Sequence, residues 1–159
     1  MKRVYPKVKK IINLSLNEAK SRGCEEVKLE HLIITMINDN NNEGTKYLKK
    51  LNIDLDKLHT MIELKVGVNG DSDPNKLKVK NISLNKETEE ILKNAESECD
   101  KLGEDFINTH HIILSILNKN NFITKLIEKM GVNYKKYSEE ITNNFGNINN
   151  DDDDDGMGM

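Results

Sequence analysis

The sequence predicts an all-α fold: an eight-helix bundle made of two four-helix repeats related by a pseudo-twofold axis. Apolar residues recur at helical spacing in segment after segment. Aromatic residues make up only 4% of the chain and tryptophan is absent, which suits an interior filled by aliphatic side chains of packed helices. The second half of the chain also repeats the pattern of the first.

The first repeat is predicted over residues 4–66. Pro6 fits the first turn of its first helix, where a missing N–H breaks no hydrogen bond, and Gly23 follows the helix end. The apolar face of this helix is formed by Val4, Val8, Ile11, Ile12, Ser15 and Ala19. The second helix has a regular apolar stripe of Leu29, Leu32, Ile33, Met36 and Ile37. A short third helix follows the asparagine-rich stretch 38–42, and Asp54 is placed to cap the fourth.

A linker is predicted over residues 67–82, which are rich in Gly, Asp and Ser and lack a helical period. The second repeat is then predicted over residues 83–145, with Asn85 and Asn133 placed to cap its first and last helices. Its four apolar faces contain Ile91, Leu92, Ala95 and Cys99, then Thr109, Ile112, Ile113, Ile116 and Leu117, then Ile123, Leu126, Ile127 and Met130, and finally Tyr134, Tyr137, Ile141 and Phe145.

Matched positions define the repeat. Gly23 falls on Gly103 and His31 on His111, both at an offset of 80 residues. After the second helix the offset is 79, so that Thr45 falls on Thr124. So long a period indicates a duplicated structural unit, of which neither copy buries its apolar faces well alone.

Charge and composition exclude several classes of function. The net charge is −3, and it becomes +2 without the five aspartates at 151–155, so neither nucleic acid nor a membrane is an expected partner. No apolar stretch reaches the length of a membrane span or follows the basic residues near Met1, so we expect neither a membrane-spanning helix nor a signal peptide. Cys24 and Cys99 form no CxxC pair, and we expect a cytoplasmic protein with reduced thiols. Residues 146–159 are predicted to be a disordered acidic tail.

Paired motifs resemble those of the Clp N-terminal repeat. Segments 27–34 (VKLEHLII) and 107–114 (INTHHIIL) are similar to its GTEHLLL element. Segment 17–23 (NEAKSRG) resembles the end of its first helix, and segments 48–55 (LKKLNIDL) and 127–134 (IEKMGVNY) resemble its LxxLGVDL element. The match covers residues 4–145 and occurs twice. The chain thus resembles the N-terminal domain of Clp-family unfoldases, most closely the ClpC type.

The resemblance implies a domain that binds substrate proteins and adaptor proteins. In such a protein, two AAA+ rings of the same polypeptide unfold the substrate and feed it to a Clp peptidase. The alternative is a structural cap and adaptor-docking module of a ClpA- or ClpB-type chaperone that does not bind phosphoarginine. The chain has no Gly-Lys dipeptide and hence no phosphate-binding loop for ATP, so we expect a non-catalytic domain without cofactor or metal.

The resemblance also implies site residues. In ClpC-type domains the glutamates of the paired motifs bind phosphorylated arginine, and Glu30 occupies that position in the first repeat. The second repeat has His110 instead, and a neutral imidazole cannot form the same ion pair. Leu29 stands where the family has a capping threonine, which Thr109 keeps. The candidate phosphoarginine-binding residues are Leu29, Glu30, His31, Thr109, His110 and His111.

Structural roles compete with these assignments. Glu30 also suits the N-terminus of a helix by its charge, and His31 and His111 suit local hydrogen bonds at helix starts. Adjacent residues on a helix point about 100° apart, so His110 and His111 are expected to chelate a metal poorly. The acidic pairs at 25–26 and 104–105 are interpreted either as solvated loops or as a ring around an arginine-binding surface.

Overall fold

The computed structural model describes residues 3–66 and 82–151, and their side chains as far as Asn144. In the first repeat it contains β1 (Arg3–Val4), α1 (Pro6–Ser21), β2 (Glu26–Val27), α2 (Leu29–Asp39), α3 (Glu43–Lys50) and α4 (Leu55–Val66). In the second it contains β3 (Ser83–Leu84), α5 (Lys86–Lys101), β4 (Phe106–Ile107), α6 (Thr109–Leu117), α7 (Phe122–Lys129) and α8 (Tyr134–Asp151). The predicted all-α architecture is confirmed.

The short strands are a feature that the sequence does not predict. β1 pairs in parallel with β4 of the second repeat, and β2 pairs in parallel with β3. Hydrogen bonds from Tyr5 N to Ile107 O and from Asn85 N to Val27 O, both 2.9 Å, extend the two pairings. The first strand of each repeat therefore pairs with the second strand of the other repeat. The prediction that Val4 belongs to the first helix is wrong, because its backbone is engaged in this pairing.

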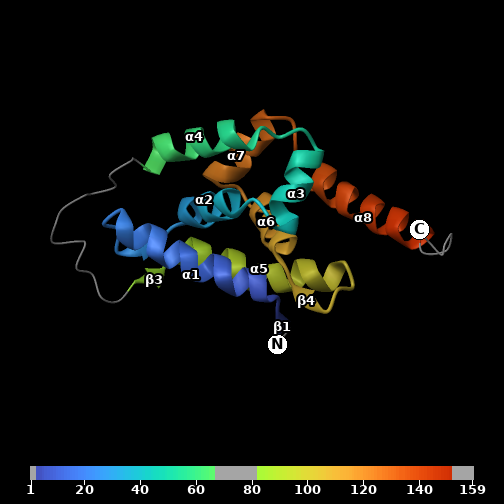
Figure 1. Ribbon diagram of the computed structural model, residues 1–159, viewed down its shortest axis with the longest axis horizontal. Helices are drawn as coiled ribbons and strands as arrows, with labels where there is room; N and C mark the ends of the chain where they lie inside the picture. The colour runs from blue at the N-terminus through green and yellow to red at the C-terminus, as the bar shows by residue number, and fades with distance from the viewer. Residues whose placement is uncertain (1–2, 67–81, 152–159) are drawn as a thin grey trace.

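A single hydrophobic core joins the two repeats. α3 and α6 lie at the centre of the molecule, α4 lies beside α7, and α8 extends away from the centre (Figure 1). The core includes the predicted stripes of α2 and α6, and Ile11, Ile62, Ile91 and Ile141 from the surrounding helices are no more than 2% exposed. Neither repeat buries its apolar faces without the other.

Gly44 is the point of closest approach between α3 and the second repeat. Its N–H donates to Thr109 Oγ1 at 2.8 Å, and its carbonyl accepts from Tyr137 Oη at 2.7 Å. A Cβ atom at this position would meet Met36 Cε at 3.0 Å and Ile113 Cγ1 at 3.1 Å. The absence of a side chain at residue 44 is therefore required by the packing of α3 on α6.

Local capping follows the sequence closely. Asp54, Asn85 and Asn133 each accept a hydrogen bond from the backbone N–H three residues later, at 3.1, 2.9 and 2.9 Å. The three predicted caps are confirmed. α2 ends where Asn40 adopts the left-handed conformation, with φ of 52°.

The ends of the predicted linker and tail differ from the described structure. α8 continues to Asp151, beyond the expected end of the second repeat at residue 145. The remaining tail, 152–159, and residues 67–81 of the linker lie outside the described residues. Among the described helices, none is both long and apolar enough to cross a membrane.

Candidate functional site

The two predicted motifs form the N-termini of α2 and α6. His31 Nδ1 accepts a hydrogen bond from Lys28 N at 2.9 Å, and His111 Nδ1 accepts one from Asn108 N at 2.8 Å. Both residues are 0% exposed. The local hydrogen bonding predicted for the two histidines is confirmed. Because Nδ1 is an acceptor, each neutral ring carries its proton on Nε2.

Thr109 does not cap α6 as expected. It is the first residue of the helix, and Asn108 is the capping residue, whose Oδ1 accepts from Thr109 N at 2.7 Å. The Thr109 hydroxyl instead accepts the hydrogen bond from Gly44 that joins the repeats. Leu29 is 1% exposed and belongs to the core. These two residues serve packing between helices.

Glu30 forms a small charged site with residues from both repeats. Its side chain is 7% exposed, and Oε2 accepts a hydrogen bond from Lys65 Nζ of α4 at 2.7 Å. The Lys65 side chain is 47% exposed, and its ammonium lies 4.3 Å from the centroid of the Phe122 ring on α7. The Glu30 carboxylate is thus paired with the ammonium of Lys65, which also lies over an aromatic ring of the other repeat. We call Glu30, Lys65 and Phe122 the first-repeat site.

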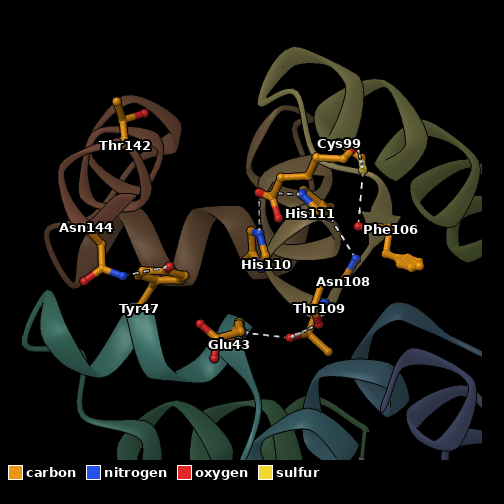
Figure 2. Close-up of polar contacts among 12 residues, drawn as sticks. Glu43, Tyr47, Cys99, Phe106, Asn108, Thr109, His110, His111, Thr142 and Asn144 are labelled. Carbon is orange, nitrogen blue, oxygen red and sulfur yellow. Dashed lines mark hydrogen bonds and ion pairs between the residues drawn. The ribbon is translucent and has the colours of Figure 1, made fainter. Parts of the chain in front are cut away.

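His110 and His111 converge on Glu104, which lies in the loop between α5 and β4. Glu104 Oε2 is 2.9 Å from His110 Nε2 and 3.1 Å from His111 Nε2, and the ring centroids are 4.1 Å apart (Figure 2). Although adjacent residues on a helix point about 100° apart, the long side chain of Glu104 contacts both imidazoles. The solvated-loop interpretation is also wrong for Glu104.

Electrostatics of this cluster follow from its burial. Burial by itself would raise the pKa of Glu104, but hydrogen bonds from His110 and His111 outweigh it and hold the pKa at about 2. Burial lowers the pKa of His111. The cluster therefore holds an ionised carboxylate at neutral pH. A carboxylate is thus present beside His110, although residue 110 itself is not acidic.

The two repeats differ because Glu104 falls on Cys24 at the offset of 80 residues. Both His31 Nε2 and His111 Nε2 are buried without a hydrogen bond of good geometry among the described residues, but His111 Nε2 has the Glu104 carboxylate oxygen as an ion-pair contact at 3.1 Å. Burial and the charge of Arg22 lower the pKa of His31 to about 4. The sequence signal for Glu104 was its place in an acidic turn, but spacing alone did not link it to His110.

The cluster also has the composition of a metal site, and its hydrogen bonds argue against that role. The ligand atoms of Glu104, His110 and His111 all lie within 4.8 Å of one another. A metal on His111 Nε2 needs the proton to move to Nδ1, but Nδ1 already accepts from the backbone N–H of Asn108. Binding would break the helix cap. The geometry fits a hydrogen-bonded carboxylate between two imidazoles better.

A pocket of about 400 Å³ opens beside the cluster, between the repeats. Tyr47 of α3 packs edge-on against His110, with centroids 5.7 Å apart, and Asn144 Nδ2 donates to its hydroxyl at 3.3 Å. The pocket is lined by Tyr5, Lys7, Asn41, Asn42, Glu43, Tyr47, Glu104, Asn108 and His110. The structure thus brings His110 and His111 together at Glu104, while Glu30 joins Lys65 and Phe122 instead.

Comparison with known proteins agrees with this architecture. The family model of the Clp repeat (R) N-terminal domain matches residues 3–124 and 83–158. The chain is 21% identical over 145 residues to chaperone protein ClpB of Oceanobacillus iheyensis, covering 91% of this chain and 17% of that protein. It is 30% identical over 128 residues to the ClpA homolog of Trieres chinensis, an ATP-binding subunit of an ATP-dependent Clp protease, covering 80% of this chain and 14% of that protein.

A third relative is the negative regulator of genetic competence ClpC/MecB of Bacillus subtilis, 19% identical over 145 residues, with 91% of this chain and 17% of that protein covered. The chain therefore spans less than a fifth of the length of these relatives, and ClpB, ClpA and ClpC are all represented among them.

Solved structures share the fold. A chain from structural investigations of a malarial protein secretion system superposes with a TM-score of 0.74 at 19% identity, covering 90% of this chain and 95% of that one. The N-domain of ClpV from Vibrio cholerae superposes with a TM-score of 0.73 at 16% identity, covering 87% and 82%. Two helical repeats that exchange strands, matched by a family model along most of the chain, show that this protein belongs to the Clp repeat (R) N-terminal domain family.

Proposed function

We propose that this domain receives substrate proteins and adaptor proteins for a ClpC-type unfoldase, and that it binds phosphorylated arginine at the first-repeat site. In this proposal the AAA+ rings of the same polypeptide unfold the substrate and pass it to a Clp peptidase. A ClpV N-domain has been solved in complex with a VipB peptide, which supports peptide binding as a role for the fold. The observation that carries the phosphoarginine proposal is the Glu30–Lys65 pair.

Phosphoarginine presents N–H donors and a negatively charged phosphoryl group close together. The carboxylate of Glu30 accepts hydrogen bonds from the guanidinium nitrogens, and the ammonium of Lys65 pairs with the phosphoryl oxygens. Phe122 offers an aromatic face to the guanidinium plane. Glu30 also lies in the first turn of α2, where backbone N–H groups favour an anion.

The experiment is isothermal titration calorimetry of the chain with free phosphoarginine, repeated with Glu30→Gln. The variant keeps the shape of the side chain but loses its charge, so we expect affinity to fall at least about tenfold. Glu139→Gln, which removes an exposed carboxylate on α8, is the control and keeps wild-type affinity. Absence of binding in the wild type would refute phosphoarginine recognition, and unchanged binding in Glu30→Gln would remove Glu30 from the site.

A second candidate function is the structural cap and adaptor-docking module of a ClpA- or ClpB-type chaperone. It is favoured by the burial of Glu30 against Lys65, since an internal ion pair by itself accounts for an acidic residue there. In that case adaptor binding survives Glu30→Gln and no phosphoarginine binding is measured. The two candidates therefore differ in the same titration.

A further inference from the structure

We propose that Lys65 makes the first-repeat site selective for phosphorylated over unmodified arginine, an inference that rests on the function proposed above. Lys65 does so by occupying the carboxylate of Glu30 when no ligand is bound. An unmodified guanidinium has to displace this internal cation. A phosphorylated arginine gives the displaced ammonium a new partner.

The geometry establishes the internal occupancy. The Lys65 ammonium lies 2.7 Å from Glu30 Oε2 and 4.3 Å from the centroid of the Phe122 ring. A carboxylate oxygen and an aromatic face are also what a guanidinium group binds in proteins. The Glu30 side chain is only 7% exposed, so a ligand gains access to it by moving Lys65. Lys65 thus competes with any cationic ligand.

Displacing Lys65 from Glu30 with an unmodified arginine gains little free energy. One cation replaces another on the same carboxylate, and the released ammonium returns to water. Lys65 is 47% exposed on the last turn of α4, so it moves without disturbing the core. The net result is a weak site for the many unmodified arginines on protein surfaces.

The free-energy balance is different when phosphoarginine displaces Lys65 from Glu30. Its guanidinium nitrogens pair with Glu30, and the ammonium of Lys65 pairs with the phosphoryl oxygens rather than with solvent. The ion pair between protein side chains is replaced by two charge-assisted contacts with the ligand. Lys65 thereby opposes the unmodified side chain and favours the modified one.

The equivalent site of the second repeat lacks the lysine and the aromatic ring of the first-repeat site. Lys65 falls on Asn144 and Phe122 falls on Glu43 at the offset of 79 residues. Asn144 carries no charge, accepts a hydrogen bond from Lys50 Nζ at 2.9 Å and donates to the Tyr47 hydroxyl. The selectivity is therefore a property of the first repeat.

The test compares wild type with Lys65→Met, titrating each with free arginine and with free phosphoarginine. Binding is followed by amide chemical shifts, which detect millimolar affinities. In Lys65→Met we expect arginine affinity to rise by a factor of about five and phosphoarginine affinity to fall by a similar factor. Lys57→Met removes the same charge from an exposed position on the same helix and leaves both affinities unchanged.

Lys65→Gln is a second variant in case Lys65→Met does not fold, because glutamine keeps a hydrogen-bond donor for the Glu30 carboxylate. The same changes in arginine and phosphoarginine affinity are expected for it. Arginine affinity that stays the same, falls or remains undetectable in both Lys65 variants overturns the inference. That result leaves the proposed function intact if wild type still binds phosphoarginine through Glu30. If phosphoarginine does not bind wild type, the proposed function fails, and the selectivity that rests on it fails with it.

Discussion

Acidification should destabilise the domain through His31. The neutral ring is fully buried with Nδ1 accepting from the backbone, and its pKa is lowered from 6.5 to about 4. Between pH 6.5 and pH 4 the His31 ring is protonated in the unfolded chain but stays neutral in the folded domain. The stability that the neutral ring contributes is therefore complete above pH 6.5 and is lost as pH falls toward 4.

The size of the effect follows from the shift. One pKa unit corresponds to about 1.4 kcal/mol, so the full window from pH 6.5 to 4 is worth roughly 3 kcal/mol. About 2 kcal/mol of this is lost by pH 5. Glu104 acts in a lower window, because its stabilisation is present above pH 4.5 and is lost as pH falls toward about 2. Measurements between pH 7 and pH 5 therefore avoid the window in which Glu104 acts.

Charged groups around His31 act against each other. Arg22 and Lys28 lower the pKa of His31, whereas Glu18 and Glu30 raise it. Burial lowers this pKa more than any one of these charges changes it. Because these neighbours are retained in a His31 variant, a substitution at residue 31 alone reports on the ring.

The assay is urea unfolding followed by far-UV circular dichroism at pH 7, 6 and 5. His31→Gln removes the titrating ring but keeps an acceptor that reaches back to the backbone N–H of residue 28. We expect wild type to lose about 2 kcal/mol more than His31→Gln between pH 7 and pH 5. Equal pH dependence of wild type and His31→Gln, or a His31 ring resonance that titrates near pH 6.5, would refute the reasoning.

Two further substitutions test the Glu104 cluster within the second repeat and the contact of Gly44 between the repeats. Glu104→Gln removes the charge that His110 and His111 contact, and it should lower the free energy of unfolding at pH 7 by about 1–3 kcal/mol in urea titrations. Asp105→Asn, an exposed neighbour, should change it little, and equal effects would contradict the cluster. Gly44→Ala places a Cβ within about 3 Å of atoms of α2 and α6 and should cost about 1–3 kcal/mol, measured by thermal unfolding. An unchanged melting temperature would show that α3 can move off α6.

Much of the fold could be predicted because its signals are local. Apolar period, glycine stops and capping residues depend on neighbours within a few positions, and Asp54, Asn85 and Asn133 all cap as expected. The resemblance to the family misplaced the α6 cap by one residue, since Asn108 and Thr109 both suit it and only the backbone conformation chooses between them.

The sequence by itself determined the duplication, the helices and the positions of the two motifs, because periodic burial and matched spacing are properties of a chain read in order. Tertiary structure alone decided which strands are exchanged, since two-residue strands have no period to read. It also decided that Lys65 occupies Glu30 and that Glu104 meets both histidines. These contacts depend on how separate segments pack, and on side-chain directions that sequence spacing does not specify.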